Sequence, residues 1–273
     1  MEGGFMYRLG MPTLVELESI NDQAELCKEL ALDFVELNMN VPLYLPDMLS
    51  ADRLIGLKRQ FGIDFTVHLP EELDIASFQT SIREGHMNCC KEAIRWAGAA
   101  QIETLNMHLN NGIYFTLPDQ RVWINERYED EFKRLLLASY RELWRYAEEH
   151  RVKLCIENTG NFHIPLIRRA LDALSVNDNF YLTWDAGHDA KAGFKELAFF
   201  TAHVDRIRHM HLHDMNEISD HQPLYSGKVP VNDRLRFAYE RGLSVVIEIK
   251  TAEALRQSVA LLKQRFVYAQ DPR

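Results

Sequence analysis

The chain has 273 residues, of which 47% are hydrophobic and 26% are charged, and its formal net charge is −9. The length is usual for a (β/α)8 barrel, and the composition is that of an ordinary globular protein. The acidic balance disfavours nucleic acid as a partner, because negative surfaces repel phosphate backbones, and the longest apolar runs are too short to span a membrane.

No composition shift or linker divides the chain, so we expect one domain over residues 1–273, with residues 1–6 as a disordered tail. The N-terminal segment MEGGFMYRLG lacks the charged and apolar regions of a signal peptide, which favours a cytoplasmic protein. The cysteines form no CxxC pattern, and we expect them to be reduced: Cys27, Cys89, Cys90 and Cys155.

Strand-like and helix-like segments alternate along the whole chain. Strands are predicted at residues 7–12, 34–40, 65–70, 104–109, 153–159, 180–186, 207–214 and 244–250. Helical apolar spacing lies between them and is clearest at residues 21–33, 128–150 and 251–266. This alternation indicates βαβ units and a parallel sheet, and eight units predict a single α/β (β/α)8 TIM barrel. The segment GMPTLVELES after the first strand has no GxGxxG, which argues against an open doubly wound sheet.

The inward face of the predicted strands turns polar towards their C-terminal ends. Residues two apart on a strand share a face, which groups Glu36 with Asn38 and places Thr66, Asn106 and Thr183 one layer below the strand ends. A purely structural barrel would fill this face with aliphatic side chains. Buried polar groups need partners, so we expect an ion or a substrate there and assign Glu36 and Asn38 to substrate binding.

Six of the eight strands end in a side chain that can bind a metal ion: His68, His108, Glu157, Asp185, His211 and Glu248. A parallel barrel brings these ends to one rim. A lone strand histidine is more often a core residue, but packing alone does not explain six ligands at six strand ends. The carboxylates suit Mn²⁺, Mg²⁺, Co²⁺ or Zn²⁺, and the additional histidines His188 and His221 shift the preference towards Zn²⁺, Mn²⁺ or Fe²⁺.

Two long segments follow the second and fourth strands, at residues 40–48 and 110–126. They carry Tyr44, Tyr114, Phe115 and Trp123. Loops of this length at a barrel rim are typical of active-site walls. Their aromatic rings could stack on a sugar or pack on one another to fix the loops. We assign Trp123 to substrate binding on the first interpretation.

Four motifs give the chain a family resemblance. They are IENT around Glu157, WDAGHDAKAG with Asp185 and His188, HMHLHD around His211, and IEI around Glu248. With these motifs, nearly the whole chain resembles the xylose-isomerase-like barrel superfamily, which holds sugar isomerases and epimerases together with endonuclease IV enzymes. In the epimerase branch, the resemblance implies one divalent ion bound by Glu157, Asp185, His211 and Glu248, with the two glutamates also serving as acid and base.

The endonuclease IV branch implies more metal ions. There, the positions of His68 and His108 also bind metal, Glu157 bridges two ions, and His188 holds a third with an Asp-x-His pair. Here Ser219 stands two residues before His221, and the usual LGxG ending is LYSG. These departures weaken the expectation of a third ion.

The leading hypothesis is a metal-dependent isomerase or epimerase of a sugar, sugar phosphate or polyol ketone. Glu157 and Glu248 would transfer a proton through a metal-stabilised enediolate, and His188 would contact a substrate oxygen. Lys250 would add positive charge beside the substrate or pair with a rim carboxylate. The expected partner is a small carbohydrate, and the resemblance allows a homodimer.

Two other classes of function stay open. An endonuclease-IV-like phosphodiesterase would use several ions, which His68 and His108 favour and the acidic charge disfavours. The third hypothesis is a barrel that only binds a metabolite. The complete set of metal ligands argues against it. Lys228 and Arg234 are the candidates for contacting a substrate phosphate.

Overall fold

All eight predicted strands form, and they close into one parallel barrel. The computed structural model describes residues 7–266, in which the barrel strands follow the order β1-β10-β9-β8-β7-β4-β3-β2. Their bounds are β1 Arg8–Pro12, β2 Phe34–Asn38, β3 Asp64–His68, β4 Thr104–His108, β7 Lys153–Glu157, β8 Tyr181–Asp185, β9 Ile207–Leu212 and β10 Ser244–Ile247. The prediction of a single (β/α)8 barrel is therefore confirmed.

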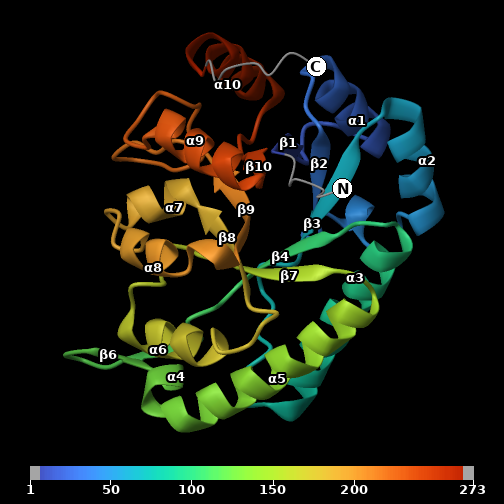
Figure 1. Ribbon diagram of the computed structural model, residues 1–273. Helices are drawn as coiled ribbons and strands as arrows, with labels where there is room; N and C mark the ends of the chain where they lie inside the picture. Colours follow the sequence, from blue (N-terminus) through green and yellow to red (C-terminus); the bar gives the residue numbers. More distant parts are fainter. Residues whose placement is uncertain (1–6, 267–273) are drawn as a thin grey trace.

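Helices surround the barrel and connect successive strands (Figure 1). They are α1 Ile20–Glu29, α2 Ala51–Phe61, α3 Thr80–Ala99, α4 Ile124–Arg127, α5 Glu129–Glu149, α6 Pro165–Leu174, α7 Ala186–Lys191, α8 Leu197–Ala202, α9 Val231–Arg241 and α10 Ala252–Arg265, with short 3-10 turns η1 Pro42–Tyr44 and η2 Val204–Arg206. No helix within residues 7–266 combines the length and apolarity needed to cross a membrane.

One element was not expected from the sequence. Residues 110–126, predicted as an irregular loop, contain a hairpin of β5 Tyr114–Thr116 and β6 Arg121–Trp123. The hairpin projects from the molecule beside α4 and α6 (Figure 1). Each of its strands has three residues, and none of these six residues is buried. The sequence of the hairpin therefore lacks the alternation of buried and exposed residues by which a strand is recognised.

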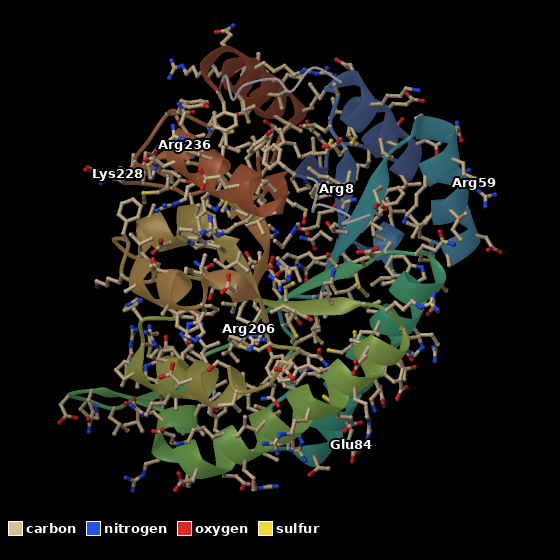
Figure 2. All side chains as sticks on the ribbon, viewed as in Figure 1. Arg8, Arg59, Glu84, Arg206, Lys228 and Arg236 are labelled. Carbon is tan, nitrogen blue, oxygen red and sulfur yellow. The ribbon has the colours of Figure 1, made fainter. Side chains whose placement is uncertain are left out.

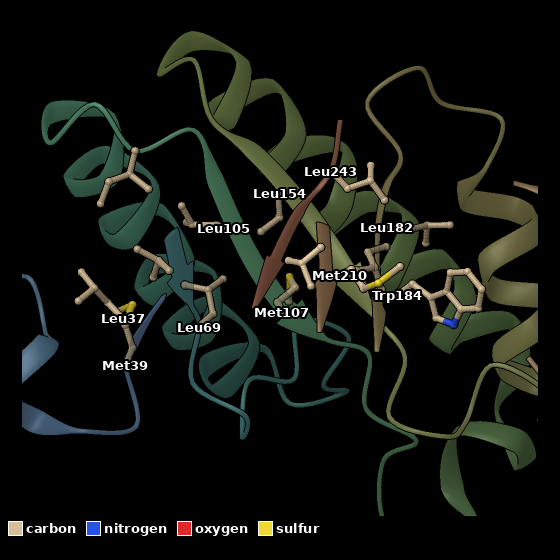
Figure 3. Packing of buried hydrophobic residues seen from close by; sticks show 14 of the residues in the cluster. Leu37, Met39, Leu69, Leu105, Met107, Leu154, Leu182, Trp184, Met210 and Leu243 are labelled. Carbon is tan, nitrogen blue, oxygen red and sulfur yellow. The ribbon is translucent and has the colours of Figure 1, made fainter. Parts of the chain in front are cut away.

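The main apolar core lies between the strands and the surrounding helices. Leu105, Leu154 and Leu182 on neighbouring strands are each at most 1% exposed, and together with Met107 and Trp184 they belong to one continuous cluster (Figure 3). Full burial of such a side chain contributes roughly 1.5–3 kcal/mol relative to exposure. The cluster therefore fixes the strands, and with them the positions of the residues at their ends.

The inside of the barrel is polar near the C-terminal ends of the strands, as the two-residue periodicity predicts. Glu36, Thr66, Asn106, Thr183 and His209 are all buried. Thr66 lies beside Glu36 in the register of β2 and β3, and its hydroxyl donates to Glu36 Oε2 at 3.0 Å. A layer of polar side chains thus lies inside the barrel directly below the strand ends.

Candidate metal centre at the barrel rim

The six strand-end residues converge at one rim. Four of them are the last residues of their strands, namely His68, His108, Glu157 and Asp185. His211 is the penultimate residue of β9, and Glu248 follows β10 directly. Short connections then hold the rim together: Asp185 caps α7 by accepting from His188 N at 2.6 Å, and the side chain of Asn158 bonds to both backbone groups of Asp185.

Four of these side chains surround one point. Glu157, Asp185, His211 and Glu248 each offer one ligand atom, and these atoms lie within 4.8 Å of one another. His211 Nδ1 is 3.1 Å from Glu157 Oε1, 3.3 Å from Glu248 Oε2 and 4.0 Å from Asp185 Oδ2. We call this set the carboxylate centre.

The carboxylate centre concentrates negative charge in a buried place. Burial alone would raise the pKa of Glu157, but the attraction of His211 and hydrogen bonds from neighbouring histidines hold it well below its usual range. Burial is likewise outweighed at Glu248, whose pKa is lowered by His211 and Lys250. Burial would lower the pKa of His211, yet Glu157, Glu36 and Glu248 raise it far above its ordinary value. The raised pKa of His211 shows that the surrounding carboxylates favour a positive charge at this position.

Two unpartnered atoms show that this arrangement suits a metal ion. His211 Nδ1 and Glu248 Oε2 are buried and, like His211 Nε2 on the other side of the ring, have no hydrogen-bond partner among residues 7–266. Such groups are costly unless something satisfies them. Three carboxylates and one imidazole form a ligand set for Mn²⁺, Zn²⁺ or a related divalent ion. The residues present therefore fit the ion that the sequence predicted.

A second candidate metal group shares Glu157 with the carboxylate centre. His68 Nε2 lies 3.3 Å and His108 Nε2 lies 3.6 Å from Glu157 Oε2, which also accepts from Asn106 Nδ2. The three ligand atoms of His68, His108 and Glu157 lie within 4.8 Å of one another. Glu157 consequently presents one oxygen to each group, which is the arrangement required of a carboxylate that bridges two ions.

A third group joins His188, His213 and His221 within the same 4.8 Å limit. His221 Nε2 is 3.4 Å from Glu248 Oε1, and its Nδ1 is 3.2 Å from Asp220 Oδ1. His213 is engaged already, since its Nδ1 accepts from His221 N at 2.9 Å and its Nε2 lies 3.1 Å from Asp185 Oδ1. His213 therefore serves first to hold Asp185, and its group is a weaker metal site than the carboxylate centre or the group of His68, His108 and Glu157.

These groups face a cavity of about 440 Å³. It is lined by His68, Glu71, His108, Asn110, Glu157, Thr159, His188, His221, Glu248 and Lys250. Lys250 Nζ is 2.7 Å from Glu248 Oε1, so the salt bridge considered for this lysine is present. The sequence interpretation missed Glu71, Asn110 and Thr159, although each follows a ligand-bearing strand by two or three residues.

Three residues assigned to substrate binding lie elsewhere. Glu36 is 3% exposed and sits beneath His211, and Asn38 uses its side-chain oxygen to accept from Asn40 N. Trp123 lies on the hairpin, where its ring packs on Tyr114 at a centroid distance of 4.9 Å. None of the three lines the cavity formed by the described residues. Contact with the cavity therefore does not support these three assignments, which stay predictions.

The aromatic residue of the first long loop has a structural role. Tyr44 is 1% exposed, and its hydroxyl accepts from Gln23 Nε2 at 3.0 Å. Of the two interpretations of the loop aromatics, packing holds for Tyr44 and for the Tyr114–Trp123 pair. Phe115 is 58% exposed on the hairpin.

Gly187 is required by the close approach of His213. A Cβ at Gly187 would overlap the imidazole of His213 and push it away from Asp185. We expect Gly187→Ala to lower the free energy of unfolding by about 1–3 kcal/mol and to weaken metal binding. Gly85→Ala is the control, because nothing lies within 4 Å of a Cβ there and the helix should gain up to about 1 kcal/mol. Urea unfolding of both variants checks this, and equal stabilities would contradict it.

Comparison with known families identifies a match over most of the chain. A family described as xylose isomerase-like TIM barrel matches residues 24–265. A search of curated proteins gives no significant match.

Solved structures with the same fold include sugar epimerases. A D-tagatose 3-epimerase-like protein is 25% identical, with a TM-score of 0.75 over 94% of this chain and 96% of that chain. A 3-keto-D-glucoside 4-epimerase from E. coli is 16% identical, with a TM-score of 0.73 over 94% and 99%. The IOLI protein with a bound zinc atom is 17% identical, with a TM-score of 0.71 over 94% and 96%. The last two likenesses show the shared fold.

Proposed function

Because the chain belongs to the xylose isomerase-like TIM barrel family, we propose that it is a divalent-metal-dependent isomerase or epimerase of a carbohydrate. The observation that carries this proposal is the carboxylate centre, in which Glu157 at the end of β7 and Glu248 after β10 face one ion position at the edge of a cavity. Epimerases among the structures of the same fold support the reaction class.

The proposed chemistry is a proton transfer at a carbon next to a carbonyl group. Glu157, Asp185, His211 and Glu248 would hold the ion, which supplies positive charge that stabilises the enediolate. One glutamate, ionised at neutral pH, would remove the proton from one face of the substrate carbon. The other glutamate would first take a proton from solvent and then deliver it to the opposite face. His188 lines the same cavity and is placed to contact a substrate oxygen.

The charge of the cavity favours a sugar without a phosphate group. Lys250 is the one lysine or arginine among its described lining residues, and it is paired with Glu248. Lys228 lies at the outer edge of the molecule (Figure 2), 3.5 Å from Glu217. Arg234 is 9% exposed and stacks over Trp184 at 4.3 Å. Neither basic residue considered for phosphate binding is available in this cavity.

The test of the proposed function is epimer formation in D2O. The metal-loaded protein is incubated with a panel of ketohexoses, ketopentoses and keto-glycosides, and each mixture is followed by NMR. We expect one sugar to give an epimer or isomer that carries deuterium next to the carbonyl carbon, because a carboxylic acid exchanges its proton with solvent between the two steps. A product that carries no deuterium next to the carbonyl carbon would contradict proton transfer by these two glutamates.

A multinuclear phosphodiesterase is the second candidate, and the geometry of His68 and His108 favours it. Both rings approach Glu157 Oε2, which a single-ion epimerase does not require. A second ion there would allow a phosphate to be clamped between two metals. Cleavage of a duplex containing an abasic site, lost on chelation, would support this function over the first.

A further inference from the structure

The proposed metal ligand His211, on β9, lies against a buried carboxylate from β2, which β10 and β1 separate from β9 in the barrel. Its Nε2 lies 2.8 Å from Glu36 Oε1, whereas its Nδ1 faces the three carboxylates of the centre. His211 is fully buried and Glu36 is 3% exposed. Glu36 therefore stands directly behind the ligand, on the side away from the cavity.

Glu36 is itself held in place by two further side chains. Its Oε2 accepts from Thr66 Oγ1 at 3.0 Å and is 3.0 Å from His209 Nε2. His209 is fully buried, and its Nδ1 lies 2.6 Å from Ser244 Oγ. Four strands, β2, β3, β9 and β10, thus contribute to one polar column that ends at His211.

This contact decides which nitrogen of His211 is free to bind metal. Glu36 Oε1 is the carboxylate oxygen that faces this ring, and Glu36 Oε2 is occupied by Thr66 and His209. His211 Nε2 makes no aligned hydrogen bond, but a carboxylate oxygen 2.8 Å away favours the tautomer that carries its proton on this nitrogen. Loss of the remaining proton leaves the Nδ1 lone pair directed at the carboxylate centre, as a metal ligand requires.

We propose that Glu36 is a positioning residue for the metal centre, and that His209 acts through it. Glu36 fixes both the orientation and the protonated nitrogen of His211 without touching the ion or the substrate. This inference rests on the metal site of the proposed function, but it holds for an epimerase and a hydrolase alike. It also explains why a glutamate and a histidine occupy the interior of the barrel, where aliphatic residues are usual.

The test is the affinity for Mn²⁺ and Zn²⁺, measured by competition with a fluorescent chelator on metal-free protein. Second-sphere changes at metal sites typically weaken binding by about 10–100-fold, and we expect this for Glu36→Gln. Asp64→Asn is the control, because it removes a carboxylate paired with Arg8 and Lys58 at the opposite end of β3. Its metal affinity should equal that of the unsubstituted protein.

A second variant and a second readout separate positioning from a loss of folding. His209→Gln should weaken metal binding in the same direction but less, and it serves as the test if Glu36→Gln does not fold. Activity of either variant should return at saturating metal, which a damaged fold would not allow. Unchanged affinity in both variants would overturn the inference. Absence of metal binding by the unsubstituted protein would instead overturn the proposed function.

Discussion

Replacing Glu157 or Glu248 by glutamine is expected to abolish turnover while the barrel stays folded. General acid–base groups typically contribute 10²–10⁴-fold to rate, and each of these glutamates is also a ligand of the carboxylate centre, so we expect a loss of about 10³-fold or more in kcat. Each substitution keeps the shape of the side chain and removes its negative charge. The measurement is steady-state epimerisation at saturating metal, with circular dichroism to check the fold.

The control for these two variants is Glu71→Gln. Glu71 lines the same cavity but belongs to none of the candidate metal groups among the described residues. Its replacement removes a charge from the cavity wall and should change kcat far less than either substitution in the centre. Full activity of Glu157→Gln or Glu248→Gln would rule out the two-glutamate mechanism, and equal losses in all three variants would show that charge alone matters.

Removing divalent metal is expected to eliminate activity and to lower the thermal stability of the protein. Without an ion, the ionised carboxylates Glu157, Asp185 and Glu248 repel one another at close range, and among the described residues only Lys250 and the neighbouring histidines offset this repulsion. A ligand present at a thousandfold its Kd stabilises the folded state by about 4 kcal/mol, which corresponds to roughly 10 °C in Tm for a chain of this size. Calorimetry before and after chelation measures the shift.

Asp185→Asn is the matched control for chelation. This variant lacks one carboxylate of the centre, so metal should raise its Tm less than it raises that of the unsubstituted protein. Activity should return when Mn²⁺ or Zn²⁺ is added back to the chelated protein. Turnover that persists after complete removal of metal would contradict the account, as would an equal gain in Tm for both proteins.

The sequence was sufficient to predict the barrel and the residues at its rim. Strand periodicity is strong in this chain because each strand buries one face against helices, and the predicted ends differ from the observed ones by three residues at most. Closure of a parallel barrel then determines that His68, Glu157 and Glu248 meet, although they are distant in sequence. The family match over residues 24–265 confirms the resemblance inferred from the motifs.

The differences from expectation concern residues whose position depends on side-chain packing. The parity rule placed Glu36 on the inner face but could not show that His211 lies between it and the cavity. Trp123 was assigned from the length of its loop, whereas a cross-strand contact with Tyr114 holds it on a projecting hairpin. The role of His213 could not be predicted from the sequence, because its hydrogen bond from the backbone of His221 depends on the conformation of a loop.

The most direct test of the account is the divalent-metal content of the purified protein, measured by elemental mass spectrometry per chain. The carboxylate centre predicts about one ion of Mn, Zn or a related metal in each chain, retained when His68 and His108 are replaced by asparagine. Two or more ions, reduced by that double substitution, would favour the phosphodiesterase. A chain that contains no metal and gains none from added Mn²⁺ or Zn²⁺ would contradict the metal-dependent mechanism.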